Sequence, residues 1–132
     1  MARYKRIGVI GLLVIGAFLC GCGAKRYHSS VCKQRGAAFN SRVETLRREA
    51  RDQLTIGTKK PNVIQFFADR QFPVTFAPLG NQLVATGTIH TTGCAPSGCG
   101  TDDALIGVRV DVNEAGTVIS EPVVVGMYTN CL

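Results

Sequence analysis

One stretch decides the fold: Ile106-Gly107-Val108-Arg109-Val110-Asp111-Val112. Its apolar side chains alternate with a glycine and charged residues, a period of two that is typical of a β-strand with one face in the core and the other in water. The next four residues, 113–116, read Asn-Glu-Ala-Gly and favour a tight hairpin turn. We therefore expect an antiparallel return over 117–129, interrupted by Pro122 at a bulge or an edge position.

Two further strands are expected before this stretch. Residues 83–92 are rich in Val, Thr and Ile, and residues 74–76 have the same character. Pro78, Gly80 and Asn81 lie between the two segments and predict the turn that joins them.

The residues before these strands follow a helical period instead. Apolar residues recur every three or four positions, at Phe39, Val43, Leu46, Ala50 and Leu54. Gly57 ends this helix, and Thr58 is expected to cap a second helix over residues 59–70. Two N-terminal helices followed by antiparallel strands predict an α+β fold, with the helices packed on a small sheet of three to four strands.

The first 21 residues are typical of a cleaved export signal. Three basic residues among the first six precede an uncharged apolar run over 7–19. This run has 13 residues, whereas a helix needs roughly 20 to cross a bilayer. The alternatives are an ordinary secretory signal and an uncleaved anchor.

The run ends in Leu19-Cys20-Gly21-Cys22, which resembles the lipobox of bacterial lipoproteins. The resemblance implies that Cys22 carries diacylglycerol and becomes the first residue after cleavage. Residue 23 is Gly, not the Asp that retains such proteins in the inner membrane of enteric bacteria. We therefore expect a lipid anchor in the outer membrane facing the periplasm, then a tether over 22–30 and one small domain over 31–132.

Four cysteines remain after the anchor, namely Cys32, Cys94, Cys99 and Cys131. In an oxidising compartment they imply two disulfides, for which three pairings are possible. We favour Cys94–Cys99 with Cys32–Cys131, because a Pro and a Gly between the first two allow that segment to reverse direction.

A metal site or a catalytic site finds little support in the sequence. Four residues separate Cys94 from Cys99, and only His28 and His90 remain to complete a zinc site, so the spacing fits poorly. The sequence contains no nucleophile elbow, no phosphate loop and no His-Glu-x-x-His run. We expect no enzyme, no metal and no other cofactor.

The charge of the chain gives limited information about partners. The formal net charge is +6, and three of the basic residues leave with residues 1–21. The remaining excess lies between residues 25 and 60, where it is either a solvated helix face or a surface for anionic lipid or polymer. Nucleic acid is not an expected partner.

Residues 57–63, Gly-Thr-Lys-Lys-Pro-Asn-Val, resemble a motif of small outer-membrane lipoproteins of the SmpA/OmlA type. The resemblance implies two helices followed by three strands, and a role in assembling outer-membrane β-barrel proteins. The four cysteines are not part of that pattern.

These observations lead to two functional hypotheses. The first is a non-catalytic binding or assembly accessory module that docks on an envelope protein. The alternative is a periplasmic inhibitor of an envelope-targeting enzyme such as lysozyme, with the loop between Cys94 and Cys99 as its plug. Asp102 and Asp103 follow this loop and are expected to cap a turn.

Overall fold

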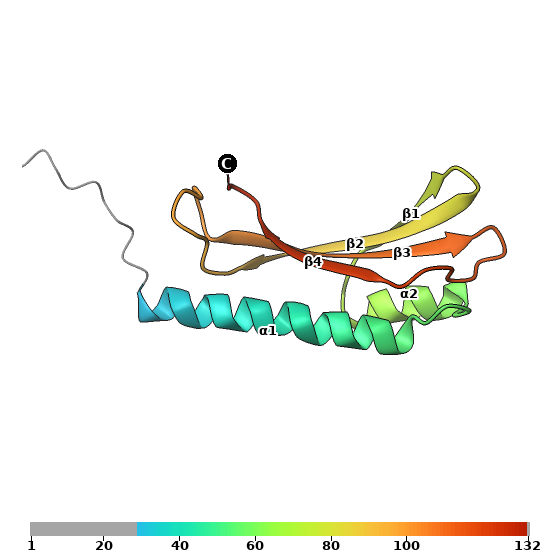
Figure 1. Cartoon of the computed structure of the whole chain (residues 1–132), viewed down its shortest axis with the longest axis horizontal. Helices are drawn as coiled ribbons and strands as arrows, with labels where there is room; N and C mark the ends of the chain where they lie inside the picture. Colours follow the sequence, from blue (N-terminus) through green and yellow to red (C-terminus); the bar gives the residue numbers. More distant parts are fainter. Residues whose placement is uncertain (1–28, 132) are drawn as a thin grey trace, which may run out of the picture.

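The computed structural model describes residues 29–131, in which two helices lie against one face of a four-stranded antiparallel sheet (Figure 1). The elements are α1 (Ser30–Gln53), α2 (Lys60–Asp69), β1 (Val74–Leu79), β2 (Gln82–Thr92), β3 (Asp103–Asn113) and β4 (Val123–Tyr128). The strands follow one another across the sheet in chain order, so β1 and β4 are its edges. The expected α+β class, with an antiparallel sheet and two disulfides, is confirmed.

Helix α1 forms where the helical period predicted it. The Ser29 hydroxyl accepts a hydrogen bond from the backbone N–H of Cys32 at 3.1 Å, which satisfies one of the free amides of the first turn. The buried side of the helix contains Cys32, Gly36, Phe39, Val43, Leu46 and Ala50. These residues pack toward the sheet, so the apolar face of the sequence is the core face of the helix.

Helix α2 begins at Lys60, close to the expected residue 59, but its predicted cap is wrong. Lys59 occupies the capping position, and no side chain caps the helix. Thr58 instead uses its backbone carbonyl to accept a hydrogen bond from Val118 at 2.9 Å. The turn between the two helices is therefore held by backbone hydrogen bonds to Val118, which follows the turn after β3. The sequence near Thr58 gives no indication of this contact.

The two prolines of the strand region lie where an edge permits them. Strand β1 continues through Pro78 to Leu79, whereas the sequence predicted a turn at Pro78. Because β1 is an edge strand, the missing N–H of Pro78 need not cost a ladder bond. Pro122 directly precedes β4, so the expected last strand is divided into an isolated bridge at Val118 and the strand itself.

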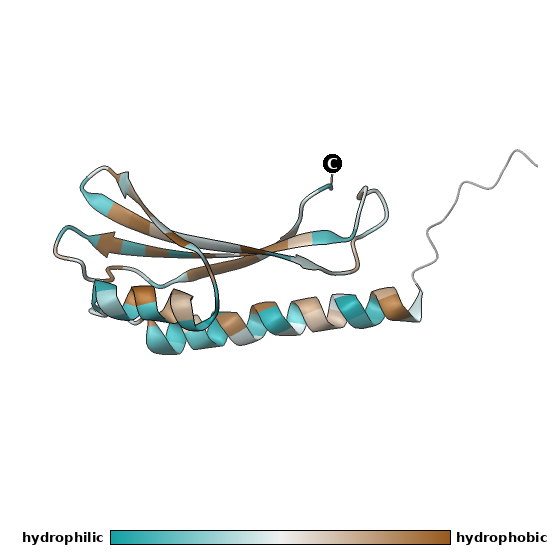
Figure 2. Cartoon of the chain, turned by 180° about the vertical axis from the view of Figure 1, so that it is seen from behind, coloured by the Kyte–Doolittle hydropathy of each residue, from teal (hydrophilic) through white to brown (hydrophobic). Residues whose placement is uncertain are grey.

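The core lies between the helices and the inward face of the sheet. Strand β3 buries Ala104, Ile106, Val108, Val110 and Val112, all at most 2% exposed, as its alternation predicted. Apolar bands recur along both helices in Figure 2, separated by hydrophilic ones. The helices and the sheet thus share one continuous apolar cluster, with polar helix faces turned to water.

The disulfides join Cys32 to Cys94 and Cys99 to Cys131, so the favoured pairing is wrong. The first two turns of α1 lie against the chain that leaves β2, because Gly36 in the second turn permits the close approach: a Cβ there would lie 2.9 Å from that of Cys94. The last residues of the chain pair with residues 99–100, which places Cys131 beside Cys99. The disulfide pairing is therefore set by which segments pack together in the folded domain and not by which cysteines are close in the sequence.

Candidate functional site

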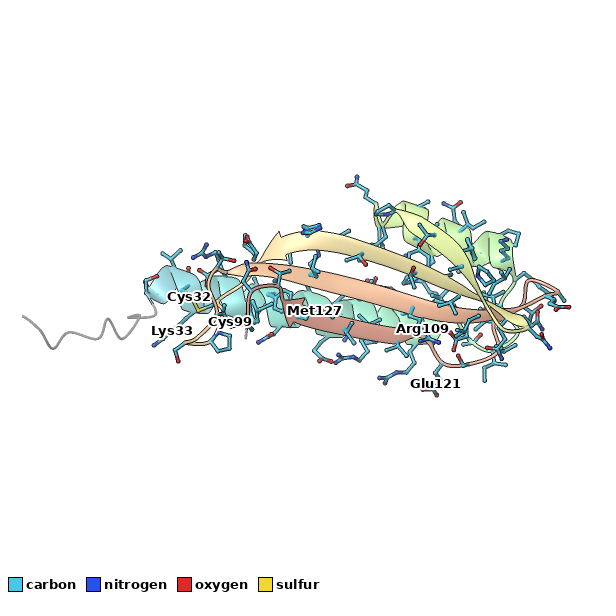
Figure 3. The ribbon with its side chains drawn as sticks, turned by 90° about the horizontal axis from the view of Figure 1, so that it is seen from above. Cys32, Lys33, Cys99, Arg109, Glu121 and Met127 are labelled. Atoms are coloured by element: carbon cyan, nitrogen blue, oxygen red, sulfur yellow. A yellow bond between two sulfur atoms is a disulfide. The ribbon has the colours of Figure 1, made fainter. Side chains whose placement is uncertain are left out.

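The four predicted disulfide cysteines gather at one end of the molecule, where α1 begins (Figure 3). We call this the stapled end: the first turn of α1, residues 93–103 and residues 128–131. Cys22, the predicted lipidated residue, and His28 lie outside the described residues. The described chain begins at Ser29, so the predicted anchor joins the domain at the stapled end.

The predicted plug loop is held tightly at this end. Ala95 is buried, and its N–H donates to Asp102 Oδ1 at 3.0 Å. Asp102 Oδ2 also lies 3.3 Å from Arg35 Nη2 of α1. The neighbouring Asp103 accepts a hydrogen bond from the Thr101 hydroxyl at 2.8 Å. Both carboxylates therefore organise the turn, as expected, and the exposed tip over 96–98 carries only small side chains.

The sheet face that looks away from the helices is uncovered in the described part of the chain. We call it the open face; Figure 3 looks onto it, with Arg109 and Met127 labelled. Its middle carries no Lys, Arg, Asp or Glu and includes Thr86, Thr88, His90, Leu105 and Gly107. The charged pair Arg109–Asp111 lies toward the far end, with 3.0 Å between Arg109 Nε and Asp111 Oδ1.

Strand β4 carries three exposed apolar side chains on this face. Val123, Val125 and Met127 are 52%, 40% and 50% exposed, and we call them the β4 stripe. Alternate residues of the same strand, such as Val124, point to the core instead. These three side chains lie next to one another along the edge strand and form one continuous apolar strip.

A groove of about 220 Å³ runs between α1 and the free side of β4. It is lined by Phe39, Asn40, Val43, Glu44, Arg47 and Gly126. Gly126 makes this approach possible, because a Cβ there would lie 2.7 Å from Val43 Cγ2 and 2.8 Å from Phe39 Cζ. The groove and the β4 stripe thus flank the same strand on its two sides.

The described residues offer no arrangement for metal chemistry. Within residues 29–131, no three His, Cys, Asp or Glu side chains gather closely enough to hold an ion. His90 lies exposed on the open face. In the same part of the chain, neither helix combines the length and the apolar character that crossing a membrane requires.

Comparisons with protein-family models, with curated proteins and with solved structures gave no match to this chain. The resemblance of residues 57–63 implied three strands, whereas the sheet has four. Sequence reasoning placed residues 123–127 within the last expected strand, 117–129, but did not identify the β4 stripe as a site. The missing information was that β4 is an edge and that nothing described covers its outer side.

Proposed function

We propose that this chain is a lipid-anchored lipoprotein of the bacterial outer membrane, facing the periplasm, whose domain is a non-catalytic binding or assembly accessory module for another envelope protein. The observation that carries this proposal is the β4 stripe, three apolar side chains between 40% and 52% exposed on the open face. Isolated exposed apolar residues are ordinary, but a contiguous row at a sheet edge is a binding feature.

The disulfides support the compartment. All four cysteines of the described chain are oxidised in pairs, and such structural disulfides persist in the periplasm and outside the cell. Under the anchor hypothesis, the 24 residues of α1 lead away from the membrane attachment. A helix of that length spans roughly 36 Å, so the far end of the domain stands clear of the lipid headgroups.

The anchor is tested by metabolic labelling with a fatty acid. We expect Cys22→Ser to lose the label and either to leave the membrane or to remain as the uncleaved precursor, while the matched Cys20→Ser variant keeps the label and the membrane association. Labelled, membrane-bound Cys22→Ser protein would contradict the anchor assignment.

The binding role is tested with a photo-crosslinking residue placed at single positions in intact envelopes. We expect one discrete adduct from Val125 and none from Ile64, an exposed apolar residue of α2 on the other layer. Met127→Lys should remove the Val125 adduct because it charges the stripe. Equal crosslinking at both positions would contradict a site on β4. If the purified protein slowed lysozyme at micromolar concentration, the inhibitor hypothesis would take precedence.

A further inference from the structure

The two edges of the sheet differ in their chemistry. Strand β1 contains Pro78, which lacks an N–H and blunts that edge. Strand β4 reads Val-Val-Val-Gly-Met-Tyr and has neither proline nor charge. Uncharged segments of this kind pair readily with a further strand. Of the two edges, only β4 lacks the usual protection in its own sequence.

The backbone of β4 directs hydrogen-bonding groups outward along this edge. The N–H of Thr129 donates to Asp103 O at 3.0 Å, so the odd-numbered residues pair with β3. The even-numbered residues Val124, Gly126 and Tyr128 therefore direct their N–H and C=O groups away from β3. In agreement, the Val124 carbonyl accepts a hydrogen bond from Arg47 Nη2 of α1 at 3.1 Å, from outside the sheet.

The surroundings of the edge define what can lie there. On the open-face side, the β4 stripe offers apolar contacts. On the helix side, the groove offers an acidic group at Glu44 and a basic group at Arg47, which form an ion pair with each other. A strand laid beside β4 places alternate side chains on these two sides. Such a strand would complement these two sides if its apolar side chains faced the β4 stripe and if a cationic and an anionic side chain faced the groove.

From this match we propose that the partner contributes an amphipathic extended strand that adds to β4 as a fifth strand of the sheet. Its apolar side chains pack along the β4 stripe, and its polar side chains lie over the groove, a basic one near Glu44 and an acidic one near Arg47. Main-chain bonds to Gly126 and Tyr128 supply the common part of the affinity, and the alternating side chains supply the specificity. The inference rests on the proposed binding role and names the chemistry of its partner.

A second copy of this chain fits the same edge less well. Helix α1 packs closely against β4, with Phe39 and Val43 against Gly126. Paired strands lie about 4.8 Å apart, whereas packed helices need 8–10 Å between their axes. Two copies joined through β4 would bring their α1 helices too close, so a strand with no helix beneath it is the better occupant.

The test uses the purified protein in detergent and the synthetic peptide Val-Thr-Val-Lys-Val-Glu-Val-Thr. We expect the peptide to slow hydrogen exchange of the Gly126 and Tyr128 amides about tenfold, because these two N–H groups become paired. The amide of Val125, already directed to β3, should not change. A peptide of the same composition with its four valines in succession should give no protection.

Two lysine variants locate the effect. Val125, Gly107 and Thr88 form one cross-strand row on the open face. Val125→Lys should weaken peptide binding about tenfold, because it places a charge beside the incoming apolar side chains. Thr88→Lys, two strands away in the same row, should leave the affinity within about twofold. Both positions are exposed, so neither variant threatens the core.

The outcomes separate this inference from the proposed function. Peptide binding without protection of Gly126 and Tyr128, or equal binding of the reordered peptide, would overturn strand addition. A position-specific adduct at Val125 in envelopes would then still support the binding role. Protection by the peptide with no adduct in envelopes would support strand addition at this edge and count against the envelope role.

Discussion

The two ends of the domain are stabilised in different ways. At the far end, α2 and the last turn of α1 close over the sheet, and the two largest fully buried side chains, Phe67 and Leu54, lie there. At the stapled end the buried side chains are small, namely Cys32, Ala95 and Cys99. Both disulfides lie at this second end (Figure 3).

This difference shows where a small domain needs covalent bonds. Helix α2 covers only the far end of the sheet, so the apolar area available near the start of α1 is limited (Figure 1). Small domains commonly add disulfides where the core alone buries too little apolar surface. The disulfides stabilise the end at which packing is thin, which is also the end that the proposed anchor would pull on.

The largest effect is expected at the far end. Phe67 is fully buried and packs edge-to-face with Phe66 and Phe72, with ring centroids 5.8 and 6.2 Å away. Phe67→Ala should lower the free energy of unfolding by about 3–5 kcal/mol, because it removes these contacts and leaves a cavity. Urea denaturation measures the change. Ile64→Ala, on the exposed side of the same helix, is the control and should cost under about 0.5 kcal/mol.

Removal of a disulfide should weaken the stapled end almost as much. The Cys32–Cys94 bond spans 62 residues and the Cys99–Cys131 bond spans 32. Paired Cys→Ala variants should cost about 4 kcal/mol for the longer loop and about 0.6 kcal/mol less for the shorter one, from the entropy of the unfolded chain.

Two measurements check the disulfide result. A non-reduced digest should contain only the 32–94 and 99–131 linkages, and hydrogen exchange in reductant should accelerate at the stapled end before the far end. Uniform acceleration over the whole sheet would mean that the two ends unfold as one unit, and would remove the distinction between them.

A smaller effect is expected midway between the ends, at Gly126. A Cβ there would meet Val43 and Phe39 of α1 at under 3 Å, so Gly126→Ala must displace side-chain ends. We expect a loss of about 1–3 kcal/mol from overpacking. Gly107→Ala is the matched control, since its Cβ would lie 3.5 Å from Val125 Cγ2, an ordinary contact. Equal losses at both glycines would indicate a general intolerance of the sheet to alanine, not a close approach of α1.

The regular elements could be predicted because their signals are local. The alternation over 106–112 and the helical spacing from Phe39 to Leu54 each report one face of one element. The Thr58 cap failed because a distant residue, Val118, holds that segment by its backbone. Contacts of this kind depend on the assembled fold and leave no trace in a short window of sequence.

The disulfide pairing and the β4 stripe were inaccessible for the same reason. We favoured the Cys94–Cys99 pair because it closes a short loop. In the structure, the start of α1 sets the position of Cys94, through a close approach at Gly36. Nothing in the sequence around Gly36 indicates that contact. The sequence predicted a last strand over 117–129, yet only the strand order shows that β4 is an edge, and only the assembled fold shows that its outer side chains are exposed.

The smallest effects are expected at Asp102, which holds the loop over residues 94–99 through a hydrogen bond and an ion pair. Substitutions can separate these two contacts. Asp102 accepts the buried N–H of Ala95 with one oxygen and pairs with Arg35 through the other. The ion pair is partly exposed, with side chains 44% and 30% accessible, so Arg35→Ala should cost at most about 0.5 kcal/mol. Asp102→Ala should cost about 1–2 kcal/mol, because it leaves the Ala95 amide buried without its acceptor. Asp102→Asn keeps an acceptor oxygen and should resemble Arg35→Ala in urea denaturation. If Arg35→Ala instead matched Asp102→Ala, the ion pair between α1 and the loop would be the important contact, and the stapled end would depend on its charges as well as on its disulfides.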